Sequence, residues 1–188
     1  MTTELIARLL DADAAYQQAM SPHYDDVLRE VSQRIDERGS IGKLDIAALT
    51  TWKRLRADTR WVAALLRLPE ADVRGITTTT CTAANNRDVS ASAAAGDARG
   101  SLSPLPGFAR GDALASAVCA AAAPARLAVY DDRAHTALTR LGIPLDNRPG
   151  RYRRYIDIID SLRTQLLEAG HTWPARRVDT ALYQLGGR

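Results

Sequence analysis

Four polar residues follow one short apolar segment and provide the clearest chemistry in this sequence. Asp131, Asp132, Arg133 and His135 come directly after residues 126–130, which read RLAVY. An aspartate at the start of a helix can cap it by accepting a backbone N–H, and the helix dipole favours the ionised form of its carboxylate. An ionised carboxylate can also stabilise a developing positive charge and orient or deprotonate a water molecule. Either aspartate fits the helix start, so the cap and the catalytic role are both open.

The residues around this carboxylate pair also have ordinary structural roles open to them. Asp132 and Arg133 are typical of a solvated surface pair, and His135 fits the exposed face of a short helix. Trp52 and Trp61 could stack on a base, but large aromatic side chains more often fill the core.

A Leu-Pro-Gly turn lies about one helix before the aspartates. It occupies residues 105–108 and opens the stretch LPGFARGDALASAVCAAAAPARLAVYDDRAH. Asp112 is expected to cap the alanine-rich helix that follows, and Pro124 is expected to stop it. A turn that leads into a helix presents backbone N–H groups at the helix N-terminus, where they bind phosphate without reading base sequence.

This order of elements resembles the helix–hairpin–helix DNA glycosylase superfamily, which includes the 8-oxoguanine DNA glycosylases. In that family a Leu-Pro-Gly hairpin grips DNA. A helix follows, then a short extended segment that ends in a catalytic aspartate, and then a helix that ends in Leu-Gly. On this chain the hairpin falls on residues 105–108, the aspartate on Asp131, and the Leu-Gly pair on Leu141 and Gly142. The resemblance is specific over residues 102–142.

The resemblance implies a protein that binds DNA and removes a damaged or modified base, with no cofactor and no metal. A flipped base would enter a pocket, and the carboxylate of Asp131 would stabilise the positive charge that develops on the sugar. Tyr130, Asp132, Arg133 and His135 would support Asp131. The DNA contacts implied at the hairpin are those of Leu105, Pro106, Gly107, Phe108, Ala109, Arg110 and Gly111.

Two departures from the family pattern limit the implied activity. Ala109 stands where the family usually has a second glycine, and Gly111 stands where bifunctional members carry the lysine that forms a Schiff base. Lys43 and Lys53 are the only lysines of the chain, and both precede the hairpin. The resemblance therefore implies hydrolysis without a covalent intermediate. A non-catalytic DNA-binding relative and an all-α interaction protein with an accidental likeness are the alternatives.

A cluster of arginines follows the aspartates in the sequence. Arg148, Arg151, Arg153 and Arg154 have no acidic residue between them. A solvated helix start is the ordinary interpretation of such a run, and a patch that contacts DNA phosphates is the functional one.

Helical periodicity covers most of the chain, and no convincing pair of strands is present. The sequence predicts an all-α fold of about nine or ten helices in a single domain, which could divide into lobes of about residues 1–104 and 105–188. Leu44 and Leu66 are assigned to buried helix faces. The four threonines at 77–80 are expected to end or distort a helix, because β-branched residues are weak helix formers. Residues 83–104 fit either a loose helix or a loop.

The composition is that of an ordinary globular protein, with 46% hydrophobic and 25% charged residues. No apolar run is long enough to cross a membrane, and the N-terminal residues lack the pattern of a secretion signal, so we expect a cytoplasmic protein without a membrane partner. Cys81 and Cys119 lack the spaced partners of a disulfide framework or a zinc site. A net charge of +3 is too small to indicate a nucleic-acid partner by itself.

Overall fold

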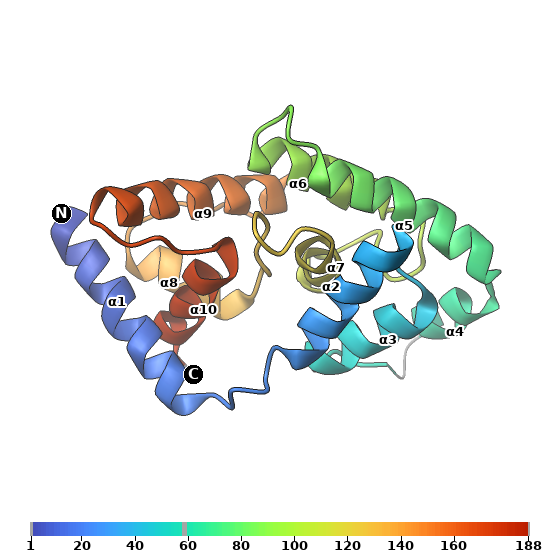
Figure 1. Cartoon of the computed structure of the whole chain (residues 1–188), viewed down its shortest axis with the longest axis horizontal. Coiled ribbons are helices and arrows are strands. Elements are labelled where there is room, and N and C mark those ends of the chain that lie inside the picture. The colour runs from blue at the N-terminus through green and yellow to red at the C-terminus, as the bar shows by residue number, and fades with distance from the viewer. Residues whose placement is uncertain (1, 58–59, 188) are drawn as a thin grey trace.

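A computed structural model describes residues 2–57 and 60–187, which form ten α-helices with no β-strand among them (Figure 1). The predicted all-α class is confirmed. In chain order the helices are α1 (Thr2–Ala19), α2 (Asp26–Arg38), α3 (Lys43–Trp52), α4 (Arg60–Arg67), α5 (Glu70–Asn85), α6 (Ala91–Ser101), α7 (Ala113–Ala122), α8 (Asp132–Arg140), α9 (Arg151–Glu168) and α10 (Ala175–Gly186).

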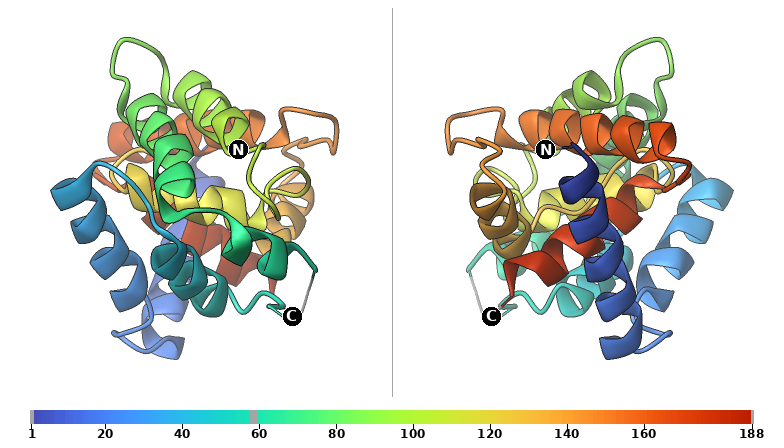
Figure 2. Two further views of the ribbon diagram at one scale, coloured as in Figure 1. Left: turned by 90° about the vertical axis from the view of Figure 1, so that its right-hand side faces the viewer. Right: turned by 90° about the vertical axis from the view of Figure 1, so that its left-hand side faces the viewer.

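The helices pack as two groups that meet where α6 lies against α9 (Figures 1 and 2). Helix α1 packs on α9 and α10, and α10 packs on α8. Helices α2, α3, α5 and α6 surround α7. The chain therefore leaves the first group after α1 and returns to it at α8, so the contacts group the helices differently from a division near residue 104.

Helix α7 is central because its side chains are small. Every residue from Leu114 to Ala122 is buried, and most of them are alanine. Small side chains let neighbouring helices approach closely on all sides of α7, and a helix that is apolar all round belongs inside a protein. Helix α9 buries only one side. The buried side is an apolar stripe of Tyr152, Tyr155, Ile156, Ile159, Leu162 and Leu166.

The four threonines do not end a helix, and that prediction is wrong. Helix α5 runs through them to Asn85, and the Thr78 hydroxyl donates to the Arg74 carbonyl oxygen at 2.9 Å. Thr77 accepts the Ile41 N–H at 3.0 Å and donates to the Ile41 carbonyl oxygen at 2.7 Å. These hydrogen bonds outweigh the weak helix propensity of threonine.

The expected burial of Leu44 and Leu66 is also wrong, because these side chains are 86% and 61% exposed. Asp45 explains the orientation of α3. Its buried carboxylate accepts the Gly42 N–H at 2.9 Å and the Arg34 Nε at 2.6 Å, which turns the preceding Leu44 outward. In α4, Leu65 faces the core and its neighbour Leu66 does not.

The ambiguous stretch 83–104 contains the end of α5 and all of α6. Ser90 caps α6 by accepting the Ala93 N–H at 3.2 Å. Within residues 2–57 and 60–187, no helix has the length and apolarity needed to cross a membrane.

Candidate functional site

Both carboxylate oxygens of Asp131 have defined partners. Oδ1 accepts the backbone N–H of Arg133 at 2.9 Å, so Asp131 rather than Asp132 caps α8. Oδ2 accepts from Lys53 Nζ at 2.5 Å. Desolvation by the surrounding protein raises the pKa of Asp131, but the lysine and the capping N–H outweigh it, and the net shift is downward. The carboxylate is therefore ionised at neutral pH.

Lys53 reaches Asp131 from the other group of helices. It follows the last residue of α3, and its side chain is 10% exposed, against 26% for Asp131. The second lysine, Lys43, points elsewhere and donates to the carbonyl oxygens of Leu66 and Leu68. Because 78 residues separate Lys53 from Asp131, local periodicity in the sequence cannot predict this pair.

The two charged groups lie in a small cavity that we call the Asp131 pocket. Its volume is about 70 Å³, which is room for about two water molecules. Four aromatic rings contribute to its walls. The lining residues are Tyr16, Tyr24, Trp52, Lys53, Arg54, Val129, Asp131, Arg176, Asp179, Thr180 and Tyr183.

A second ion-pair network supports this pocket. Arg176 donates to both carboxylate oxygens of Asp25 at 3.0 Å and also pairs with Asp179. Asp179 is buried, and it accepts the Tyr155 hydroxyl at 3.0 Å and the Val129 N–H at 3.3 Å. Burial raises the pKa of Asp179, although Arg176 opposes that shift. Because its oxygens are already engaged, Asp179 holds the pocket wall in place.

The four residues expected to support Asp131 do not all lie beside it. Arg133 supplies the capping N–H, and its guanidinium donates to the Tyr183 hydroxyl at 2.7 Å. Asp132 is exposed and does not line the Asp131 pocket. Tyr130 and His135 share a 2.9 Å hydrogen bond between Oη and Nδ1, and neither lines the pocket. Of these four residues, Arg133 therefore contacts Asp131 most directly.

Residues 102–112 connect α6 to α7 and include the predicted hairpin; we call them the connector. The side chains of Leu105 and Phe108 are buried, so they anchor the turn in the core and are not available to DNA. Gly107 has φ +89°, and the ring of Trp61 lies 2.4 Å from the place a Cβ would occupy. Pro106 is half-buried, and the next exposed residues are those at 109–111.

The predicted cap of α7 is not formed. Asp112 occupies the N-cap position, but its carboxylate accepts from Arg99 Nε at 3.1 Å and from Arg151 Nε at 2.8 Å. The first-turn N–H groups of α7 therefore have no side-chain cap. They adjoin a hollow of about 260 Å³ that we call the α7 hollow, which includes Trp61 and Gly107 in its lining.

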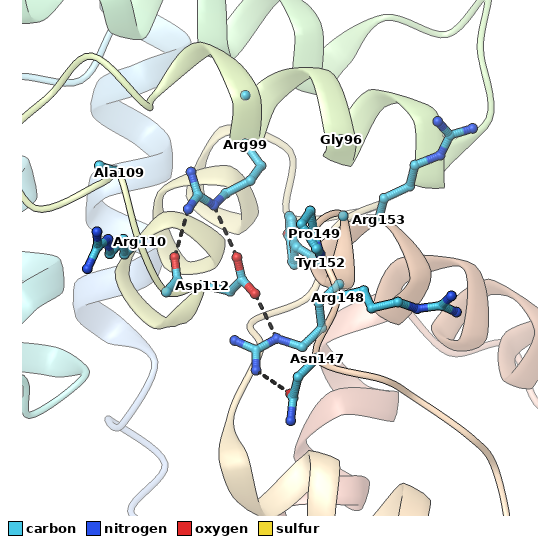
Figure 3. A pocket seen from close by; sticks show the side chains of 14 residues that line it. Gly96, Arg99, Ala109, Arg110, Asp112, Asn147, Arg148, Pro149, Tyr152 and Arg153 are labelled. Atoms are coloured by element: carbon cyan, nitrogen blue, oxygen red, sulfur yellow. Dashed lines mark hydrogen bonds and ion pairs between the residues drawn. The ribbon is translucent and has the colours of Figure 1, made fainter.

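The connector and the predicted arginine cluster meet around a larger cavity of about 560 Å³, which we call the arginine cavity (Figure 3). Arg110 lines it from the connector, Arg148, Arg151 and Arg153 line it from the start of α9 and the loop before it, and Arg99 lines it from α6; in Figure 3 the guanidinium groups of Arg148 and Arg153 point away from the Arg99–Asp112 pair. The complete lining is Gly96, Arg99, Gly100, Ala109, Arg110, Gly111, Asp112, Asn147, Arg148, Pro149, Gly150, Arg151, Tyr152 and Arg153.

Several members of the predicted cluster are already paired. Arg148 and Arg154 both donate to Asp146, and Arg154 also donates to nearby carbonyl oxygens and does not line the cavity. Arg151 pairs with Asp112. Arg153 is exposed and has no hydrogen bond or ion pair with another side chain in the described ranges.

The Asp131 pocket, the α7 hollow and the arginine cavity have shared or adjoining lining residues. Residues 52–54 line the Asp131 pocket, and residues 55 and 56 line the α7 hollow. Arg110 and Gly111 then line both the α7 hollow and the arginine cavity. A carboxylate pocket, an uncapped helix N-terminus and a basic cavity are thus connected through shared or adjoining residues.

The described residues contain no group of three or more His, Cys, Asp or Glu side chains placed to hold a metal ion. Comparison with known proteins adds no relative, because no protein-family model, curated protein or solved structure matches the chain.

Proposed function

We propose that this protein binds DNA and hydrolyses the N-glycosidic bond of a damaged or modified base, with Asp131 as the catalytic carboxylate. The observation that carries the proposal is an ionised aspartate at a helix N-terminus, inside a pocket walled by aromatic rings. Aromatic rings stack on an extruded base, and a fixed carboxylate stabilises the cationic sugar formed as the base leaves.

The pair with Lys53 defines the chemistry available to Asp131. Lys53 keeps the carboxylate charged and fixes its orientation through the 2.5 Å hydrogen bond. Because Lys53 Nζ is engaged by Asp131, water is the nucleophile in this proposal. The pocket must also open, because a volume of about 70 Å³ holds only about two water molecules.

The neighbouring surface has the character of a phosphate-binding region. The uncapped start of α7 offers backbone N–H groups beside the exposed connector residues 109–111. Backbone amides at a helix N-terminus bind phosphate without reading the base sequence, which suits an enzyme that must scan DNA.

A second candidate is a DNA-binding protein without excision activity. The small volume of the pocket and the engagement of both Asp131 oxygens favour it. In that case the Lys53–Asp131 pair has a structural role and joins the start of α8 to the end of α3.

Excision assays distinguish the two candidates. Labelled duplexes that carry oxidised, alkylated or deaminated bases are incubated with the protein under single-turnover conditions and then treated with hot alkali, which cleaves abasic sites. We expect alkali-dependent cleavage of at least one class of duplex, and none with Asp131→Asn. Salt-dependent binding without cleavage of any duplex would support the non-catalytic candidate, and an absence of DNA binding would overturn both.

A further inference from the structure

The arginine cavity concentrates positive charge to an unusual degree. Five arginines line it; Asp112 pairs with two of them and Asp146, just outside the lining, pairs with Arg148, which leaves three net positive charges around one cavity. The whole chain carries a formal net charge of only +3. A cavity with this lining attracts anions strongly.

Guanidinium groups remain available at the edges of the cavity. The side chains of Arg110 and Arg153 are exposed and make no hydrogen bond or ion pair in the parts of the chain that the structure describes. Arg99 is held in place by Asp112 and by the Gly111 carbonyl oxygen at 2.9 Å, which uses only part of its five-donor fork. Such forks match phosphate oxygens in a bidentate manner.

The wall formed by α6 leaves its backbone open at Gly100, whereas the Arg153 side chain covers Gly96, its Cδ lying 3.3 Å from the place a Cβ would occupy. Gly96 and Gly100 are one turn apart on this helix, and both line the cavity. A Cβ on Gly100 would meet no atom within 4 Å, so the space beside it is open. The sole aromatic residue among the described lining residues is Tyr152, and it is buried. The cavity is therefore suited to phosphate groups and offers no ring on which a base could stack.

The cavity and the Asp131 pocket lie on opposite sides of one extended segment. Val129 and Asp131 line the Asp131 pocket, whereas Tyr130 between them faces the other way. The guanidinium of Arg151, which lines the arginine cavity, lies 4.3 Å from the centre of the Tyr130 ring. Alternate side chains of an extended segment point in opposite directions, so Tyr130 and Arg151 lie between this segment and the arginine cavity.

We propose that the arginine cavity binds backbone phosphate groups of the same DNA strand whose base enters the Asp131 pocket. This inference rests on the proposed function and adds a second, sequence-independent point of attachment to it. Arg110 and Arg153 contact the phosphates directly, and Asp112 holds Arg99 and Arg151 in place between them. Arg110, which also lines the α7 hollow, makes the two phosphate-binding regions continuous.

The test compares two charge-matched double variants. Arg110→Gln with Arg153→Gln removes two cavity arginines, and both side chains are exposed, so the fold should be retained. Arg8→Gln with Arg87→Gln removes the same charge from exposed residues that line other hollows. Binding of an undamaged 20-base-pair duplex is followed by fluorescence anisotropy from 50 to 200 mM salt, and circular dichroism checks the fold.

We expect the cavity variant to bind on the order of tenfold more weakly, with a salt slope about two units shallower than that of the parent protein. The control variant should stay close to the parent in both quantities. Equal losses in the two variants would show a general charge effect and overturn the proposal, as would a parental slope in the cavity variant.

A competition arm identifies the source of the phosphate. Inorganic pyrophosphate should displace the duplex only weakly, because it lacks the contacts of an extended strand. If it binds the parent as tightly as the duplex does and the cavity variant loses it, the site serves a free phosphate compound, and the assignment to DNA is overturned.

The excision assay separates this inference from the proposed function. A cavity-dependent salt slope without excision of any base would leave the phosphate site standing and overturn the glycosylase. Excision of a base together with a parental salt slope in the cavity variant would support the glycosylase and overturn the phosphate site.

Discussion

Lys53 Nζ lies 2.5 Å from Asp131 Oδ2, although 78 residues separate the two in the chain. The pair joins the end of α3 to the start of α8, and so connects the two groups of helices at the proposed catalytic carboxylate. Because Asp131 also accepts the Arg133 N–H, its carboxylate is fixed at both oxygens.

Replacing Lys53 with methionine should destabilise the protein by about 2 kcal/mol at pH 7, because Asp131 would lose a charge-assisted hydrogen bond in a largely buried site. The pKa of Asp131 is lowered from its ordinary 3.8, so the pair stabilises the fold above that pH, and its contribution is lost as pH falls through the lowered pKa. Urea unfolding at pH 7 and on the acid side of pH 3.8 should therefore show a smaller difference between variant and parent in acid.

Lys53→Arg is the matched control, since it keeps the positive charge and should recover much of the lost stability. A methionine variant as stable as the parent at both pH values would show that the pair contributes nothing measurable.

Borohydride should trap no covalent adduct between the protein and DNA during excision. Trapping requires an amine that is free to attack the sugar, and Lys53 Nζ is engaged by Asp131 while Lys43 Nζ is bound to carbonyl oxygens elsewhere. Gel electrophoresis of borohydride-treated reactions tests this. A trapped species that disappears with Lys53→Ala would show that Lys53 is the nucleophile, and the hydrolytic mechanism would have to be abandoned.

The two glycines of the connector should differ in their tolerance of a side chain. Gly107→Ala should cost about 2–4 kcal/mol, because φ is +89° and the new Cβ would fall 2.4 Å from the Trp61 ring. Gly111→Ala has a similar positive φ of +73° but no atom within 4 Å, so it should cost only about 1–2 kcal/mol. Denaturant unfolding measures both, and equal losses would mean that Trp61 does not pack against the turn.

Local patterns predicted the elements of this fold better than their orientation. The helical class of α9 and the aspartate cap of α8 follow from spacing and residue type, because both depend on residues within a few turns of each other. The exposure of Leu44 did not follow, because a buried aspartate at position 45 sets the rotation of α3. The continuation of α5 through its threonines depends on hydrogen bonds to Ile41, which lies more than 30 residues away.

The candidate site was predictable in its carboxylate but not in its partners. The helix start indicated Asp131 and Asp132 alike, and the family resemblance selected Asp131, whereas Lys53, Asp112 and Arg99 act through contacts between distant segments. Asp112 shows why residue type alone misleads, since a suitable capping residue pairs with two arginines instead. The basic cluster could be placed at a helix start, but the acids that neutralise part of it could not.

The most direct test of the catalytic assignment is the single-turnover excision rate of Asp131→Asn. Asparagine caps a helix as well as aspartate does, but it cannot carry the charge. Because the variant loses the ion pair with Lys53, we expect a modest loss of stability, and rates are compared at a temperature where both proteins are folded.

The control for this measurement is Asp132→Asn, since Asp132 is exposed and does not line the Asp131 pocket. We predict that Asp131→Asn lowers the excision rate by about two orders of magnitude or more while DNA binding is retained, and that Asp132→Asn excises at the parental rate. Parental excision by both variants would contradict the account and leave Asp131 as a helix cap, whereas loss of activity in Asp132→Asn alone would assign the chemistry to the neighbouring residue.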